Sequence, residues 1–187
     1  MKRYCFLLLL AFTACVTDPD IRGTAEILAY APVYATAEQV ADIGTTAPKA
    51  TTRAGKIYAY RNYLFQVEQA EGIHIIDNTV PAEAHKIAFL KVPLCSEIAI
   101  KGGYLYTNHM DDLVVFNLAN ATAPQLVKRL EGAFPQIDQT HPPFTNTYFE
   151  CADPRKGTVV RWEQKSMKIQ NRELGIPVPK GLVHSLQ

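Results

Sequence analysis

The stretch IYAYRNYLFQVEQAEGIHIIDNTVPAEAHKIAFL at residues 57–90 recurs, one residue shorter, as IAIKGGYLYTNHMDDLVVFNLANATAPQLVKRL at residues 98–130. The matching pairs are Tyr63/Tyr104, Leu64/Leu105, Phe65/Tyr106, Ile73/Leu113, Ile75/Val115, Ile76/Phe116, Asp77/Asn117, Ile87/Val127 and Leu90/Leu130. A period of about 41 residues, built from short apolar runs, is typical of propeller blades, which carry four strands each. The sequence therefore predicts a mainly β protein with two blade-like, four-stranded repeats.

Each repeat contains four apolar runs separated by turn residues. The first two runs flank Arg61-Asn62 in one repeat and Gly102-Gly103 in the other, and two turn residues between such runs indicate a hairpin. The third runs, GIHIID and DLVVFN, are apolar on both parities, as in strands that are covered on both faces. We therefore expect Ile75 and Val115 to occupy equivalent core positions.

These segments resemble the LVIVD-type repeats of propeller-like bacterial lipoproteins. The segments that carry the resemblance are YAPVY (30–34), AGKIYAYRNYLF (54–65), GIHIIDN (72–78), KIAFLKVP (86–93), IAIKGGYLY (98–106) and DLVVFN (112–117), with a weaker match at YFECADPRKGTVVRWE (148–163). The resemblance implies an architecture rather than a chemistry, and members of this family are typically longer than this chain. We expect a short or truncated member whose blades form an open stack, with additional C-terminal strands, rather than a closed ring.

The N-terminal stretch MKRYCFLLLLAFTAC has the features of an export signal. Lys2 and Arg3 precede an apolar run that is much shorter than the roughly 20 residues needed to cross a bilayer core. The following Thr13-Ala14-Cys15 resembles a bacterial lipobox, in which the cysteine receives the lipid, although Phe12 replaces the usual Leu. We expect a signal peptide at 1–14, lipid attachment at Cys15 and a place in the outer membrane of a Gram-negative cell envelope. The alternative is a plain secretory signal.

The rest of the chain divides by composition. We expect a tether and N-terminal segment at 15–53, a propeller-like β domain at 54–166 and a loose tail at 167–187. Thr36 and Gln39 have capping-box spacing, which predicts a short helix after Thr36. An open stack exposes unpaired strand edges. We expect the strands around 29–34 or 147–166 to cover one edge, leaving the other free for a partner or for self-association.

Charge and cysteine content narrow the partners. The net charge of +1, without a basic stripe, argues against a nucleic-acid partner. Cys95 and Cys151 form an even pair that can make one disulfide in an oxidising compartment, and two buried free thiols are the alternative. We expect no cofactor, because the chain has no CxxC, P-loop or dinucleotide-binding motif.

Candidate catalytic residues are sparse. His109, Asp111 and Asp112 could hold a metal ion, but a solvated loop is the favoured interpretation because no second His lies at ligand spacing. His74 occupies the register of Val114, which favours a core histidine over a general base. The serines lie outside nucleophile-elbow patterns; they are Ser96, Ser166 and Ser185. We therefore expect neither a catalytic nor a metal site.

Two function classes remain open. The favoured one is a membrane-tethered, non-enzymatic binding or scaffolding module for an unknown protein or glycan ligand. The alternative is a carbohydrate-processing accessory or degraded hydrolase, which requires two carboxyl groups roughly 5–10 Å apart in a cleft. The candidate carboxylates are Glu68, Glu71, Asp111 and Asp112. The aromatic residues that could form a sugar platform are Tyr104, Tyr106, Phe116, Phe144, Tyr148, Phe149 and Trp162.

Overall fold

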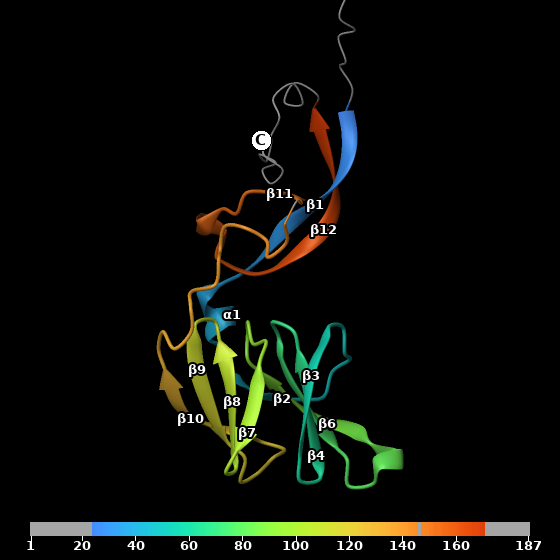
Figure 1. The fold of residues 1–187 in the computed structure, drawn as a ribbon, viewed down its shortest axis with the longest axis vertical. Coiled ribbons are helices and arrows are strands. Elements are labelled where there is room, and N and C mark those ends of the chain that lie inside the picture. Colours follow the sequence, from blue (N-terminus) through green and yellow to red (C-terminus); the bar gives the residue numbers. More distant parts are fainter. Residues whose placement is uncertain (1–23, 146, 171–187) are drawn as a thin grey trace, which may run out of the picture.

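The structure, a computed structural model, describes residues 24–145 and 147–170. It contains three sheets, with the strand orders β2-β6-β5-β4-β3, β10-β9-β8-β7 and β11-β1-β12. The first two sheets stand side by side, and the third projects away from them along the direction of their strands (Figure 1). The protein is therefore mainly β and its sheets do not close into a ring, as the repeat predicted.

The first blade consists of four consecutive antiparallel strands. They are β3 (Ala54–Tyr60), β4 (Tyr63–Glu68), β5 (Gly72–Asp77) and β6 (His85–Lys91), with the 3-10 helix η1 (Pro81–Glu83) before the last strand. Arg61 takes a positive φ of 54° in the β3–β4 turn, a conformation that suits Gly better than Arg. The tight hairpin therefore forms despite an unfavourable residue.

The second blade repeats this arrangement. Its strands are β7 (Ile98–Lys101), β8 (Tyr104–His109), β9 (Asp112–Asn117) and β10 (Gln125–Leu130). In the last strand of each blade one residue is left without a partner in the register, Ile87 in β6 and Val127 in β10. These two bulge residues are matched in the sequence repeat, so the two blades are equivalent residue by residue.

The first blade has a fifth strand that the sequence did not predict. Residues Gly44–Thr46 form β2 and pair with Phe89–Lys91 of β6. This strand lies in the segment at 15–53 that was expected to be a tether and N-terminal segment, and residues 47–53 after it form a loop. The outer edge of the first blade is therefore covered, whereas β10 ends the second blade as an edge strand.

The third sheet is a stem made from opposite ends of the described chain. Strand β1 (Thr24–Ala35) pairs antiparallel with β12 (Thr158–Gln170), and the short β11 (Tyr148–Phe149) runs parallel to β1. The 3-10 helix η2 (Pro154–Lys156) precedes β12. The expectation that these segments cover a blade edge is wrong, because they pair with each other.

This pairing changes the expected domain boundaries. The blades end at Leu130, so the expected domain at 54–166 includes strands that belong to the stem. The expected tail at 167–187 begins inside β12, and its remainder lies outside the described residues. The signal peptide and Cys15 also lie outside them.

A short helix connects the stem to the first blade. Helix α1 (Ala37–Ala41) begins with the predicted capping box, in which the side chains of Thr36 and Gln39 each accept a hydrogen bond from the other residue's backbone. Within residues 24–145 and 147–170, no helix has both the length and the apolar character needed to span a membrane.

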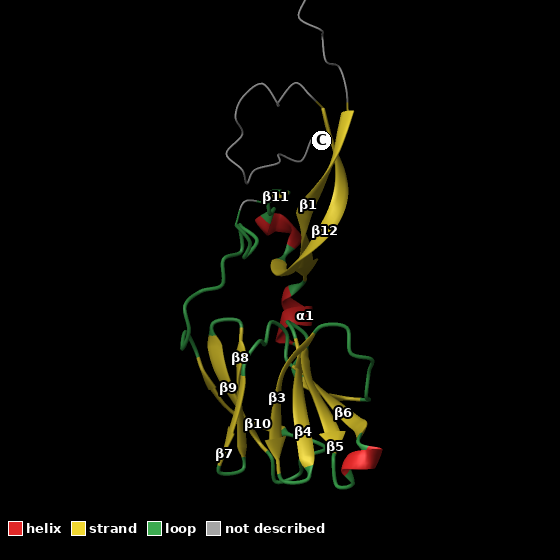
Figure 2. Ribbon diagram, turned by 45° about the vertical axis from the view of Figure 1, so that its right-hand side comes forward, coloured by secondary structure: helices red, strands yellow, loops and turns green. Residues whose placement is uncertain are grey.

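The main core combines side chains of the two blades, whose strands stand next to each other in Figure 2. Its buried members are Phe65, Val67, Ile73, Ile75, Ala88, Leu90, Val92, Cys95, Ile100, Leu105, Val114, Phe116 and Leu118. Strands β3 and β7 adjoin, and the Tyr58 hydroxyl donates to the Ile100 carbonyl at 3.0 Å. Ile75 belongs to this core, and in the second blade Val114 rather than Val115 belongs to it. Val115 is nevertheless buried, at 8% exposed, so the expectation that Ile75 and Val115 are matched buried positions is confirmed, although the two residues have different surroundings.

Candidate binding face

Glu68 and His74 form a buried pair beneath the loop at 47–53, which we call the cap loop. The Glu68 carboxylate accepts hydrogen bonds from the Thr52 amide at 3.0 Å, the Thr52 hydroxyl at 2.6 Å and the Arg53 amide, and its other oxygen lies 2.9 Å from His74 Nε2. Burial raises the pKa of Glu68, but these hydrogen bonds outweigh it and lower the pKa to about 2. The pair fastens the cap loop to the blade, and His74 is a core histidine, as predicted.

The other candidate carboxylates are engaged separately. Glu71 forms an ion pair with Lys49. Asp112 binds the Arg129 guanidinium at 3.0 Å and accepts from the Gly132 amide at 3.0 Å. Their partners lie on different loops and strands. Among residues 24–145 and 147–170, no group of three or more metal-binding side chains comes together.

His109 was expected in a solvated loop, and this expectation is wrong. The residue is buried at the end of β8, where Nε2 lies 2.9 Å from the Val40 carbonyl of α1. Burial lowers the pKa of His109 and favours the neutral imidazole. A carbonyl only accepts, so Nε2 carries the proton. His109 therefore joins the second blade to α1.

The remaining candidates also separate in space. The Ser96 amide and hydroxyl both donate to Asn108 Oδ1, Ser166 lies in the stem strand β12, and Ser185 is outside the described residues. The candidate aromatics divide between the second blade and the stem region, where Phe149 contacts Trp162 edge to face. They do not build one sugar platform.

Both described cysteines are free thiols in this structure. The Cys95 thiol is buried and donates to the Gly72 carbonyl at 3.3 Å. Burial raises the pKa of Cys95 to about 12, so this thiol is a poor nucleophile. Cys151 lies between β11 and η2, near the stem.

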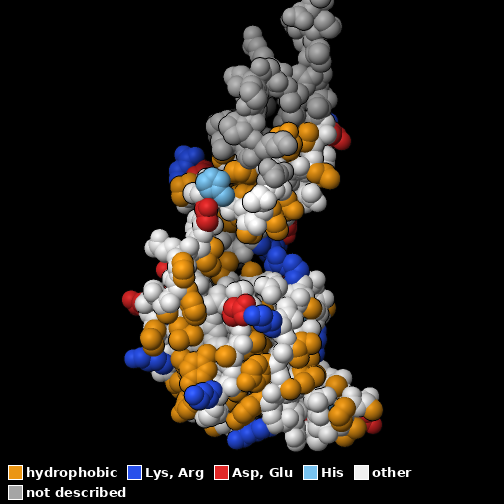
Figure 3. All heavy atoms as spheres, viewed as in Figure 1, with side chains coloured by type: hydrophobic (Ala, Val, Ile, Leu, Met, Phe, Trp, Pro, Cys, Tyr) orange, Lys and Arg blue, Asp and Glu red, His pale blue; other side chains and the backbone are white. Residues whose placement is uncertain are grey.

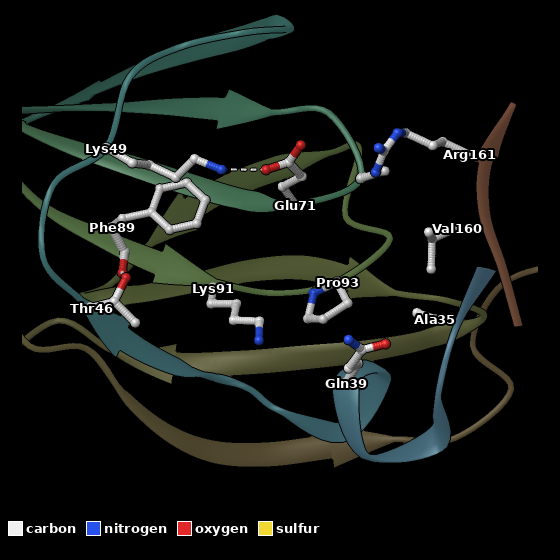
Figure 4. A pocket seen from close by; sticks show the side chains of 11 residues that line it. Ala35, Gln39, Thr46, Lys49, Glu71, Phe89, Lys91, Pro93, Val160 and Arg161 are labelled. Carbon is white, nitrogen blue, oxygen red and sulfur yellow. Dashed lines mark hydrogen bonds and ion pairs between the residues drawn. The ribbon is translucent and has the colours of Figure 1, made fainter. Parts of the chain in front are cut away.

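A cavity of about 360 Å³ lies where the stem meets the first blade (Figure 4). It is lined by the cations Lys49, Lys91 and Arg161 and floored by Phe89. Each cation already has a carboxylate partner: Glu71, Asp42 at 2.5 Å and Glu163 at 2.7 Å. An anionic ligand would have to compete with these carboxylates, because all three cations that line the cavity are already in ion pairs.

The feature that stands out is one face of the second blade, which we call the open face. Alternation and register place Tyr104, Tyr106, Leu113, Val115, Lys128 and Leu130 on this face, and we include the bulge residue Val127, which precedes Lys128 in β10. Tyr104, Val127 and Leu130 are 39%, 50% and 45% exposed, whereas Val115 is only 8% exposed. In the view of Figure 3, apolar side chains interrupted by single Lys and Arg residues cover much of the blade region.

The matched residues of the first blade are covered. Phe65, Ile73, Ile75 and Leu90 are fully buried, and Tyr63 and Ile87 pack partly buried against the core. The second blade is what covers them. The open face therefore corresponds in the repeat to the face with which the first blade packs against the second, and the sequence could have indicated it, since the repeat matches Leu90 to Leu130 and Ile87 to Val127.

No family model, curated protein or solved structure matches this chain.

Proposed function

We propose that the protein is an envelope lipoprotein, anchored through Cys15 in the outer membrane, that works as a non-enzymatic binding or scaffolding module. The open face is its binding surface. The observation that carries this proposal is the exposure of Tyr104, Val127 and Leu130, whose matches in the first blade are partly buried (Tyr63 and Ile87) or fully buried (Leu90). A clustered apolar surface of this kind marks an interaction site rather than ordinary surface.

The stem sets the distance between the proposed lipid anchor and the blades. Eight residues separate Cys15 from Thr24, where β1 begins. Even fully extended they span at most about 30 Å. Thr24 lies at the end of the stem away from the blades (Figure 1), so an anchor at Cys15 holds the stem near the bilayer and the blades farther out.

The acidic residues favour a binding module over a carbohydrate-processing accessory or degraded hydrolase. A general acid needs a proton to give near neutral pH. Glu68 is buried with a pKa of about 2, and Asp112 is held by Arg129 and the Gly132 amide. The resemblance to LVIVD-type repeats implies an architecture and no particular chemistry.

Site-specific photo-crosslinking in living cells tests the binding role. A photoreactive residue at position 127 is expected to give a discrete protein adduct on illumination. Val80 is the matched control, because it is also a valine, is 51% exposed and lies in the turn before η1. Equal labelling at 80 and 127, or no adduct at 127, would contradict a binding role for the open face.

A further inference from the structure

We infer that the open face binds the outer face of the first blade of a second copy, so that two chains join head to tail in a ring of four blades. This inference rests on the binding role proposed above and names the partner. The outer face is the side of the first blade turned away from the second. Its apolar residues are Ile57, Ala59, Leu64, Ile76 and the buried Phe89, and register places Gln66, Glu68, His74 and Lys86 on the same side.

The interface between the two blades of one chain shows which surface packs against the open-face type of surface. The first blade contributes Phe65, Ile75 and Leu90 to this interface, and the second blade contributes Leu105, Val114 and Phe116. The matches of Phe65, Ile75 and Leu90 in the second blade are Tyr106, Val115 and Leu130, and they lie on the open face. The complementary surface is therefore one equivalent to that of Leu105 and Phe116.

The outer face of the first blade is that equivalent surface. Leu64 matches Leu105, and Ile76 matches Phe116 in the repeat. Leu105 and Phe116 are buried against the neighbouring blade, but Leu64 and Ile76 are only partly buried. Ile57 is 59% exposed, whereas its match Ile98 packs against the core. Each chain thus carries both halves of the interface, one at each end of its stack.

The cap loop fits this geometry. It covers the outer part of the face, where Thr51 Oγ1 approaches His74 and Lys86 donates to the Lys49 carbonyl at 3.0 Å. Ile57, on β3, remains exposed beside it. Strands β3 and β7 adjoin within the chain, so they mark the inner side of the stack. Blades arranged radially around a channel diverge outward, and a loop can fill the wider outer gap while the inner strands still meet.

Symmetry closes the arrangement. A head-to-tail interface uses two different surfaces and makes a ring when the rotation closes. Two copies supply four blades, the lower end of the usual range of about four to eight in propellers. Each stem continues along the strand direction (Figure 1). Rotation about an axis along the strands leaves both stems on the same side, where both anchors reach one membrane.

The test measures the oligomeric state of the full chain, purified in detergent, by native mass spectrometry and sedimentation velocity. The wild type is expected to be a dimer. Val127→Glu on the open face and Ile57→Glu on the outer face each bury a charge in the interface, and each should weaken the dimer by about 100-fold. Val80→Glu is the matched control, because Val80 is as exposed as Val127 and lies on neither face. It should stay dimeric.

Mixing the two variants identifies the geometry. The Val127→Glu chain keeps its outer face and the Ile57→Glu chain keeps its open face, so together they retain one intact interface. A mixed dimer should form although neither variant pairs with itself. Circular dichroism checks that the variants fold, and Leu130→Lys provides a second open-face substitution at a 45% exposed position.

Three results would overturn the inference. The first is a monomeric wild type. The second is loss of the dimer with Val127→Glu but not with Ile57→Glu, which would indicate two open faces packed against each other. The third is a photo-crosslink from position 127 to a different protein while the purified chain is monomeric. That result would leave the proposed binding role standing and reject only the second copy as partner.

Discussion

At the residue scale, the buried acid of this protein holds structure together. The Glu68 carboxylate accepts hydrogen bonds from Thr52, Arg53 and His74 at once, and Glu68 and His74 are fully buried. Removing one partner of such a network leaves buried donors without an acceptor, which costs far more than losing an exposed ion pair. Glu68 and the exposed Glu97 therefore make a useful pair for comparison.

Glu68→Gln is expected to lower the free energy of unfolding by about 2–3 kcal/mol at pH 7. Glu97→Gln, which removes only an exposed ion pair with Lys56, should cost about 0.5 kcal/mol or less. Urea denaturation with both variants measures the difference. Equal costs would mean that the cap loop does not depend on Glu68.

The same carboxyl predicts a pH dependence. The folded pKa of Glu68, about 2, lies below its ordinary value of 4.5, so its stabilisation is present above pH 4.5 and is lost as the pH falls toward 2. The stability gap between wild type and Glu68→Gln should therefore narrow over this range. Denaturation curves at a series of pH values check this, and a constant gap would rule it out.

At the element scale, equivalent strands have different surroundings. Val114 and Val115 are neighbours in β9, but Val114 faces the first blade and Val115 lies on the open face. Side-chain alternation in a strand sends adjacent residues to opposite sides. The repeat therefore predicts which way each residue points, while the neighbouring element decides how much it stabilises the fold.

Val114→Ala is expected to lower the free energy of unfolding by about 2 kcal/mol, and Val115→Ala only slightly less, because the two side chains are 0% and 8% exposed. The same side chain is shortened in both variants, so the comparison shows what each side of β9 contributes. Chemical denaturation under dilute, monomeric conditions measures the two losses. A negligible loss at Val115 would show that this side of β9 does not stabilise the isolated chain.

The entry into β12 depends on Gly157. Its φ of 116° lies in a region that L residues rarely adopt, and an added Cβ would lie 2.4 Å from the Ala35 carbonyl oxygen. Gly157→Ala should therefore loosen the β1–β12 pairing and destabilise the stem by about 1–3 kcal/mol. Gly132 is the control, since it also has a positive φ but its Cβ would meet nothing within 4 Å. Hydrogen exchange should show faster amide exchange in β12 only for Gly157→Ala.

At the scale of the whole molecule, the stem separates the two ends of the protein. It pairs residues 24–35 with residues 158–170, and the blades lie at its far end (Figure 1). The proposed anchor before β1 and the proposed binding face on the second blade are therefore at opposite ends. This is a suitable arrangement for a module that reaches a partner away from the bilayer.

Cys15→Ala is expected to move the protein from the membrane fraction to the soluble fraction. The reason is that the acyl chains on the cysteine supply the membrane affinity, at about 0.8 kcal/mol for each buried methylene. Detergent partition of cell fractions measures the change, with Cys151→Ala as a control. An unchanged membrane fraction would reject Cys15 as the anchor.

The sequence by itself determined the blades. The alternation and spacing of apolar residues are local properties, and they placed β3 to β10, the core position of His74 and the capping box of α1 correctly. It did not reveal β2, the β1–β12 stem or the buried position of His109, because these depend on pairing between segments far apart in the chain. A local sequence pattern does not indicate which distant strand another strand will pair with.

The tertiary structure alone decided which matched residues are core and which are surface. Ile87 and Val127 are equivalent in sequence and both sit at a bulge, yet one packs into the core and the other is 50% exposed. The burial of a side chain depends on the element that packs against it. The second blade packs against this face of the first blade, whereas no further blade in the described part of the chain packs against the matching face of the second. For the same reason, the candidate carboxylates could be named from the sequence, but their separate partners could be found only in the folded chain.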